Sequence, residues 1–200
     1  MSFYYICQER TKASVNGKNI TDIFSTLGIE KGNKDRFLKN AESIECGMFD
    51  INSIKSYFSH SITIYKEKSD GQLAGICFFK IKTKNIDYIE IGLLCVPNRE
   101  TKSGIGKTLL KRLFIIANIA NCKIILYSIP ETIRYYEKNK FTIIERDPDT
   151  DYYDEYYEGI TEMEYTPKKH TTSSVKSKRV RGKSSRSSSM NKSTRRIHSV

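Results

Sequence analysis

Two glycines, one residue apart, begin the part of the sequence best suited to bind an anion. Gly104 and Gly106 precede a helical pattern in the run TKSGIGKTLLKRL. Peptide nitrogens at a helix start lack intrahelical partners, and glycine lets a ligand approach them closely. Lys102 and Lys107 add positive charge on either side. The amides around Ser103 to Lys107 are therefore expected to bind an anion such as a phosphate group.

A Gly-Lys-Thr triplet in the same run raises a nucleotide-binding alternative. The P-loop pattern requires a glycine five residues before Gly106, because that loop has to curl around a phosphate. Thr101 stands there instead, and threonine does not adopt a left-handed backbone cheaply. The strand predicted after the helix, KIILYSI, ends in no carboxylate for Mg²⁺. The pattern disfavours ATP, and a tight turn without any ligand stays open as an alternative.

Strands and helices that would position this loop are predicted on both sides of it. Apolar residues recur every three or four positions from Gly104 to Ala120, as in an amphipathic helix. Pro130 suits the first turn of a short helix at 130–140. Helices are also predicted at 34–43 and 51–59, and strands at 2–9, 61–67, 73–84, 87–96, 123–129, 141–145 and 161–165. The chain is therefore a mixed α/β protein, with antiparallel strands first and a strand–helix–strand–helix–strand segment after them.

In order and spacing, these motifs resemble the GNAT superfamily of acetyl-CoA-dependent N-acetyltransferases. IGLLCVPNRETKSGIGKTLLKRL, followed by RYYEKNKF, is similar to the signature half of that family, and the likeness covers residues 60–165. The family's loop has Arg or Gln where Thr101 stands here. Its Tyr-Glu-Lys-x-Gly-Phe ending is found at 136–141, with Lys140 in the glycine position. Ile129 replaces an asparagine that is common just before the last helix of the signature.

The resemblance implies a fold, a cofactor and a reaction. The fold is a mostly antiparallel sheet with a central splayed parallel pair, flanked by helices. Acetyl-CoA would supply an acetyl group to a primary amine (a protein lysine, an N-terminus or a polyamine) by direct attack within a ternary complex. The splayed strand would bind the pantetheine arm through its backbone, and the loop would bind the pyrophosphate. The implied cofactor-binding residues are Leu94, Cys95, Val96, Lys102, Ser103, Gly104, Ile105, Gly106 and Lys107.

Acetyl transfer to an amine also moves two protons. The attacking ammonium must lose one, and the departing thiolate must gain one. The resemblance implies that Tyr136 donates to the thiolate, while Tyr135 points elsewhere, towards core or solvent. The alternative for Tyr136 is a half-buried packing residue.

The strand predicted at 87–96 carries a candidate general base for the acceptor amine. Strict alternation places Glu90, Gly92 and Leu94 on one face, and the hydrophobic residues Ile89, Ile91, Leu93 and Cys95 on the other. Some members of the family carry a catalytic glutamate six residues before the hydrophobic residue that precedes the loop, and Glu90 matches it. A carboxylate on a covered strand would have a raised pKa, which suits a base. A solvent-facing glutamate is the open alternative.

Charge divides the chain near Thr166. Of 34 Lys and Arg, 11 lie in residues 168–200, where there is no Asp or Glu, so the formal net charge of +11 belongs to this segment. A Ser/Lys/Arg-rich segment buries too little apolar surface to fold, so we expect a domain at 1–166 and a disordered basic tail at 167–200. The tail could bind nucleic acid or another polyanion. An acidic, Tyr-rich tract at 145–165 could attract a basic peptide or polyamine as acceptor.

The cysteine content and the hydropathy of the sequence indicate the cellular compartment in which the protein is expected. Five scattered cysteines without a CxxC spacing predict buried free thiols in a reducing compartment, and neither a disulfide framework nor a metal site. No signal peptide or membrane span is expected. The protein is predicted to be intracellular, in cytoplasm or nucleus. Its Ile-, Lys- and Asn-rich composition suggests an AT-rich genome, such as that of a large DNA virus or a protist.

Two functional alternatives remain beside the nucleotide binder. One is a catalytically inactive GNAT-like domain that binds nucleic acid or a partner through its tail. The other is a virion-packaged or chromatin-bound basic protein.

Overall fold

The computed structural model describes residues 2–9, 11–42, 44, 50–100, 102–145 and 159–167, except for the side chain of Arg99. The expectations for the basic tail, and for most of the acidic tract, lie outside these residues. The described residues belong to one compact unit.

Ten strands and five helices are found within the described residues, together with a short 3₁₀ turn, η1. In chain order they are β1 (Ser2–Cys7), β2 (Ser14–Val15), β3 (Lys18–Asn19), α1 (Ile20–Thr26), β4 (Glu30–Lys31), α2 (Lys34–Ala41), α3 (Ile51–Ser59), β5 (Ile62–Glu67), β6 (Leu73–Thr83), β7 (Asp87–Cys95), η1 (Asn98–Glu100), α4 (Ile105–Ala120), β8 (Lys123–Ser128), α5 (Pro130–Lys138), β9 (Thr142–Ile143) and β10 (Thr161–Tyr165).

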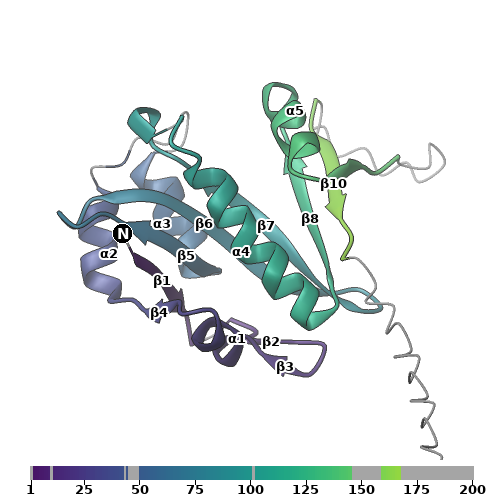
Figure 1. The fold of residues 1–200 in the computed structure, drawn as a ribbon, viewed down its shortest axis with the longest axis horizontal. Coiled ribbons are helices and arrows are strands. Elements are labelled where there is room, and N and C mark those ends of the chain that lie inside the picture. The colour runs from purple at the N-terminus through teal and green to yellow at the C-terminus, as the bar shows by residue number, and fades with distance from the viewer. Residues whose placement is uncertain are drawn as a thin grey trace, which may run out of the picture. The chain divides into compact units, whose positions relative to one another are not determined.

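Eight of these strands form one mixed sheet, in the order β4-β1-β5-β6-β7-β8-β10-β9 (Figure 1). Two neighbouring pairs are parallel, β1 with β4 and β7 with β8. The pairs β1–β5, β5–β6, β6–β7, β8–β10 and β9–β10 are antiparallel. The expectation of a mostly antiparallel sheet with a central parallel pair is confirmed.

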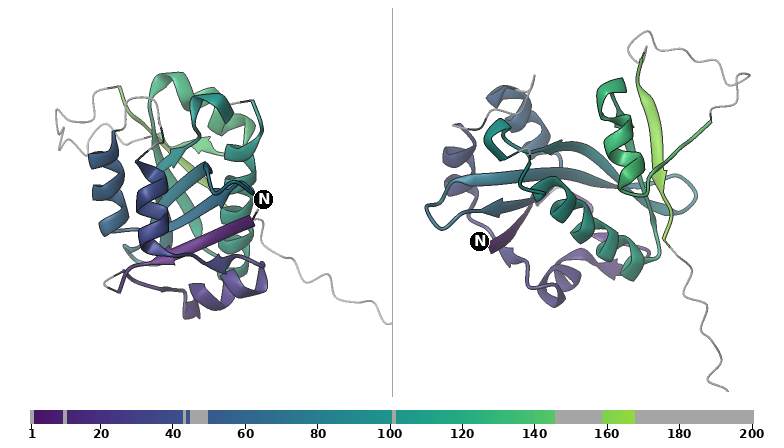
Figure 2. Two further views of the ribbon diagram at one scale, coloured as in Figure 1. Left: turned by 90° about the vertical axis from the view of Figure 1, so that its left-hand side faces the viewer. Right: turned by 45° about the horizontal axis from the view of Figure 1, so that its top comes forward.

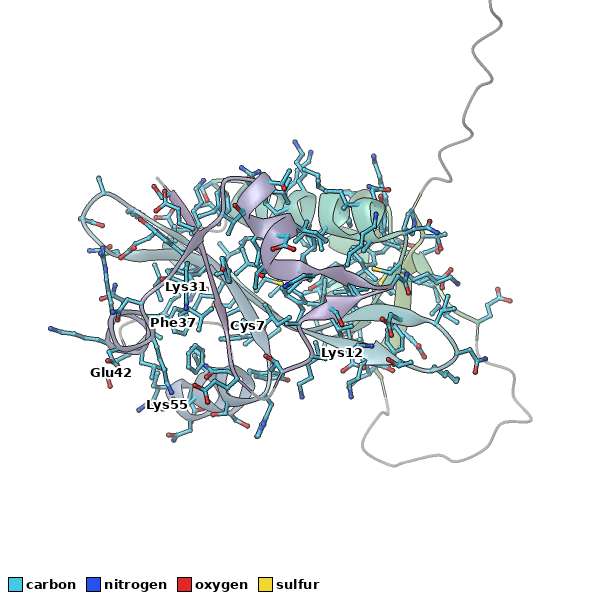
Figure 3. All side chains as sticks on the ribbon, turned by 90° about the horizontal axis from the view of Figure 1, so that it is seen from below. Cys7, Lys12, Lys31, Phe37, Glu42 and Lys55 are labelled. Carbon is cyan, nitrogen blue, oxygen red and sulfur yellow. The ribbon has the colours of Figure 1, made fainter. Side chains whose placement is uncertain are left out.

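Helices cover both faces of the sheet (Figure 2). On one face, α1 and α4 pack together over a buried cluster that includes Phe24 and Leu113. On the other face, α2 and α3 cover a second cluster around Phe37, which lies within 5.1 Å of the ring of Phe58. Figure 3 labels Phe37, a buried residue of α2. The sheet therefore separates two hydrophobic layers.

The long helix α4 lies close to the sheet because β6 has a glycine beneath it. A Cβ at Gly75 would stand 2.6 Å from Ile105 Cγ2 and 3.1 Å from Leu109 Cδ1. Any larger residue would have to push the first turns of α4 outward. Gly75 thus helps to fix where α4 begins.

Most predicted helices and strands are confirmed, and two of the residues expected to begin helices do so. Asp50 caps α3 by accepting a hydrogen bond of 2.8 Å from the amide of Ser53, and Pro130 begins α5. The strand expected at 141–145 is shorter, Thr142–Ile143. The elements between residues 14 and 31 were not predicted.

One cysteine departs from expectation. Cys77 and Cys122 are buried free thiols, as predicted. Cys95 is disulfide-bonded, so the prediction of free thiols throughout is wrong for this residue. Spacing along the sequence does not reveal which cysteines the fold brings together.

Candidate active site

The central parallel pair separates partway along its length. The ladder between β7 and β8 runs from Tyr88↔Lys123 to Ile91↔Leu126. Beyond it β7 continues to Cys95 and β8 to Ser128, and the two strands diverge towards α5 (Figure 1). On its other edge β7 stays paired with β6 as far as Cys95. The β8-side edge of β7 beyond Ile91 therefore faces the opening, which we call the splay.

A β-bulge at Gly92 changes which way the side chains of β7 point. Phe78 pairs with Leu93 and Phe79 with Ile91, so Gly92 is an extra residue on β7. Ile91 packs in the layer under α4, whereas Leu93 packs in the layer under α2 and α3. The expected alternation thus holds as far as Gly92 and is wrong beyond it: Leu93 and Cys95 share the Glu90 face, and Leu94 and Val96 turn to the α4 face.

The predicted anion loop forms the start of α4. Gly104 is the N-cap, with a left-handed φ of 74°, which glycine adopts without strain. The first intrahelical bond found at this end joins the amide of Thr108 to the carbonyl of Gly104, at 3.0 Å. The amides of Ile105, Gly106 and Lys107 come before it and have no acceptor within the helix.

Side chains around this loop divide into two groups. Lys102, Ser103 and Lys107 are exposed and can approach an anion from solvent. Ile105 is buried in the layer under α4, so only its backbone can contact a ligand. Lys68 forms an ion pair with Glu100 in η1, which ties this loop to the turn between β5 and β6.

Tyr135 lies against the first turn of α4, which sequence reasoning did not foresee. Its Oη would be 2.6 Å from a Cβ placed on Gly106, and Val96 Cγ2 would be 3.2 Å from the same atom. Burial, with a smaller contribution from Cys77, raises the pKa of Tyr135 to about 12. The expectation that Tyr135 faces core or solvent holds in part, since the residue is 37% exposed, but its hydroxyl also lies against the loop.

Tyr136 packs beside it against the hydrophobic layer under α4. Its ring meets Phe141 edge-on at 5.6 Å and Tyr135 at 5.2 Å. Burial, and to a lesser degree Cys77 and Tyr135, raise the pKa of Tyr136 well above the ordinary value. Tyr136 therefore stays protonated at neutral pH, as a proton donor must.

Cys77 shows where these two hydroxyls lie relative to the splay. Both tyrosines interact electrostatically with its thiol. Cys77 pairs with Leu94 in the β6–β7 ladder, within the part of β7 that has left β8. Tyr136 itself packs against the hydrophobic cluster on the α4 side of the sheet, which contains Cys77 and also has Leu94 packed against it.

Glu90 lies on the opposite side of the sheet, one residue before the last β7–β8 pair. Its neighbours Ile89 and Ile91 point under α4, so its own side chain points to the other face. The carboxylate is 23% exposed and lies 3.9 Å from the ammonium of Lys82. Burial, then Glu90 and then Glu162, raise the pKa of Tyr88, which places both carboxylates near that hydroxyl.

Tyr136 packs on the α4 face, whereas Glu90 points to the other face, one residue before the last β7–β8 pair. A donor bound along the α4 face and an acceptor bound on the Glu90 face could meet through the splay. Among the described residues, no three His, Cys, Asp or Glu side chains gather in a way that could hold a metal ion. No helix of the described part is long and apolar enough to cross a bilayer.

Comparison with solved structures identifies this fold as that of the GNAT acetyltransferases. The structure is similar to Tetrahymena GCN5, with a TM-score of 0.55 and 20% identity, covering 84% of this chain and 97% of that one. It is also similar to PH1933 from Pyrococcus horikoshii (TM-score 0.52, 14% identity, 69% and 95% covered). A third similar structure is Ard1 from Thermoplasma volcanium (0.50, 18%, 66% and 93%). No protein-family profile and no curated protein sequence matches the chain.

Proposed function

We propose that this protein is an N-acetyltransferase that transfers acetyl from acetyl-CoA to a primary amine, in a ternary complex by direct attack. The observation that carries the proposal is the splay, with a proton-holding Tyr136 on one face of it and a carboxylate, Glu90, on the other. The acceptor could be a protein lysine, an N-terminus or a polyamine.

The residues at the loop and on β7 fit acetyl-CoA. A pyrophosphate suits the amides of Ile105, Gly106 and Lys107, which have no acceptor within α4, with Lys102 alongside. An extended amide-bearing arm suits the β8-side edge of β7 around Leu94, Cys95 and Val96, beyond the last β7–β8 pair, where it would add hydrogen bonds as a further strand does. Once bound, acetyl-CoA supplies an activated acyl group as a thioester.

Two side chains near the splay would carry out the two proton transfers, one from the acceptor's ammonium and one to the departing thiolate. Glu90 accepts a proton from the acceptor's ammonium and leaves a nucleophilic amine. Tyr136 holds its proton until negative charge develops on sulfur, and then donates it. The raised pKa of Tyr136 means that the phenol carries its proton when the thioester binds. Val96 and Tyr135 lie beside the first turn of α4, next to Gly106.

Thermal denaturation with three ligands tests the proposal. Acetyl-CoA and coenzyme A should each raise the melting temperature, because a ligand that binds only the folded state stabilises it. Mg-ATP should not. A rise with Mg-ATP alone would support the nucleotide-binding alternative instead.

Turnover is tested separately, by following free thiol release with an amine panel and by mass spectrometry of the protein's own lysines. Binding of acetyl-CoA without any acetyl transfer would favour the inactive, partner-binding alternative.

A further inference from the structure

A small hollow lies beside Glu90, on the face of the sheet that α2 and α3 leave open. It has a volume of about 160 Å³, and its polar lining comes from three separate parts of the chain. These polar residues are Thr11, Lys12, Ser59, His60, Lys80 and Lys82. Figure 3 shows Lys12 beside the hairpin of β6 and β7. We call this feature the basic hollow.

The charges that line the basic hollow are all positive. Three of the lining residues are lysines, and none is a carboxylic acid. Lys12 is neutralised by Asp87, at 2.5 Å. Lys82 is only loosely compensated by Glu90, at 3.9 Å, and no carboxylate among the described residues forms an ion pair with Lys80. Positive charge therefore remains for a ligand to neutralise.

The donors available to a ligand are the charged groups. The hydroxyl of Thr11 donates to the carbonyl of Gln8 at 2.6 Å, and that of Ser59 to the carbonyl of Lys55 at 2.9 Å. Both hydroxyl protons are thus already used. The ammonium groups of Lys80 and Lys82 and the imidazole of His60 remain, and this set suits an oxyanion.

The basic hollow is close to the proposed base. Lys80 pairs directly with Glu90 across the β6–β7 ladder, and both point to the same face. Side chains opposite each other in such a pair begin about 5 Å apart. An amine at Glu90 and an oxyanion at Lys80 could therefore belong to one small molecule, joined by a spacer of about two to four atoms.

We propose that the basic hollow binds an oxyanion of the acyl acceptor, so that the preferred acceptor is a small amine that also carries a phosphate or carboxylate group. This inference rests on the proposed acetyl transfer. An oxyanion near Lys82 competes with Glu90 for that ammonium. The carboxylate of Glu90 is then left to accept the proton from the acceptor's own ammonium group.

Lysine footprinting tests the binding step without acetyl transfer. The full chain is treated with N-hydroxysuccinimidyl acetate, in inorganic phosphate or in chloride of equal ionic strength, and each lysine is quantified by mass spectrometry. Phosphate should slow modification of Lys80 and Lys82 about tenfold at saturation, and leave exposed Lys111 on α4 unchanged. Equal rates for Lys80 in both salts would overturn the inference.

Kinetics with a matched acceptor pair then show whether the site serves the acceptor. We expect kcat/KM to be higher for 2-aminoethyl phosphate than for ethanolamine, and free phosphate should reduce this preference because it competes for the same hollow. Lys80→Gln and Lys82→Gln should each reduce this preference about tenfold, which is roughly the effect of one charged contact. Lys111→Gln should preserve it.

The outcomes separate this inference from the proposed function. Equal use of the two amines, or a preference for spermidine that grows in Lys80→Gln, would overturn the inference and leave acetyl transfer standing. Phosphate protection of Lys80 with no transfer to any amine would overturn both, because the hollow would then bind an anion for another purpose.

Discussion

The hydroxyl of Tyr135 occupies the space into which a side chain on Gly106 would project, since a Cβ there would lie 2.6 Å from Tyr135 Oη. Helix α5 thus contacts the first turn of α4 at the residue whose amide is proposed to bind pyrophosphate. Gly106 has a structural reason to be small that is independent of any ligand.

Replacing Gly106 by alanine should therefore destabilise the protein through Tyr135. We expect Gly106→Ala to lower the free energy of unfolding by about 1–3 kcal/mol, as overpacking does. Adding Tyr135→Ala should recover part of that loss, which a double-mutant cycle in denaturant would measure. Gly104→Ala is the control: nothing lies within 4 Å of its added Cβ, so its backbone strain should not respond to Tyr135→Ala. Additive effects for the Gly106 pair would contradict the contact.

Tyr136→Phe should remove the proton donor and preserve the packing. The ring keeps its edge-on contact with Phe141, at 5.6 Å in the parent protein. We expect kcat to fall about 100-fold, a typical contribution of a general acid, with little change in KM for acetyl-CoA. Tyr135→Phe should keep most of the activity. If the two variants exchanged these results, Tyr135 would be the donor.

Lys140 stands in a strained conformation that glycine would relieve. Its φ is 73°, in the left-handed region that costs a residue with a side chain about 1–2 kcal/mol. Lys140→Gly should raise the free energy of unfolding by about 1 kcal/mol, after the entropy that glycine adds to the unfolded chain. Lys138→Gly, two residues earlier and inside α5, should instead lower it by about 0.5–1 kcal/mol. Chemical denaturation at constant pH would show opposite signs.

Asp87 should make stability depend on pH in the acid range. Hydrogen bonds from Lys12, then Thr83 and then the amide of Asn16 hold the pKa of Asp87 down to about 2. Because this pKa lies below that of an unfolded aspartate, about 3.9, the stabilisation is present above pH 4 and lost as pH falls towards 2. Asp87→Asn should be less stable than the parent at pH 7. The difference should shrink between pH 4 and pH 2, and a constant difference down to pH 2 would refute the assignment.

The central part of the fold could be predicted because its signals are local. Apolar runs mark β5 and β6, alternation marks β7, and the three-or-four spacing of apolar residues marks α4. The segment from Ser14 to Lys31 offered no such period, since its strands have two residues each and α1 has seven. Asn19 does cap α1, accepting from the amide of Thr21 at 3.0 Å, but a lone asparagine is a weak sign of a helix start.

The positions of the candidate site residues along the chain could be predicted better than the directions of their side chains. The loop at Gly104 begins a helix where expected, and Glu90 points away from α4 as alternation required. The bulge at Gly92 depends on register with β6, and the direction of Tyr135 depends on how α5 packs against α4. Both are relations between distant segments. The basic hollow likewise joins three segments far apart in sequence.

The bulge also explains how β7 can separate from β8 while it stays hydrogen-bonded to β6. A bulge bends its strand and increases the local twist, and this one follows directly after the last residue that β7 shares with β8. Since β7 stays bonded to β6 up to Cys95, its exposed edge is rigidly supported from behind. A ligand would therefore bind to a preorganised row of backbone peptide groups. The entropic cost of ordering these groups is met when the chain folds and is not added when the ligand binds.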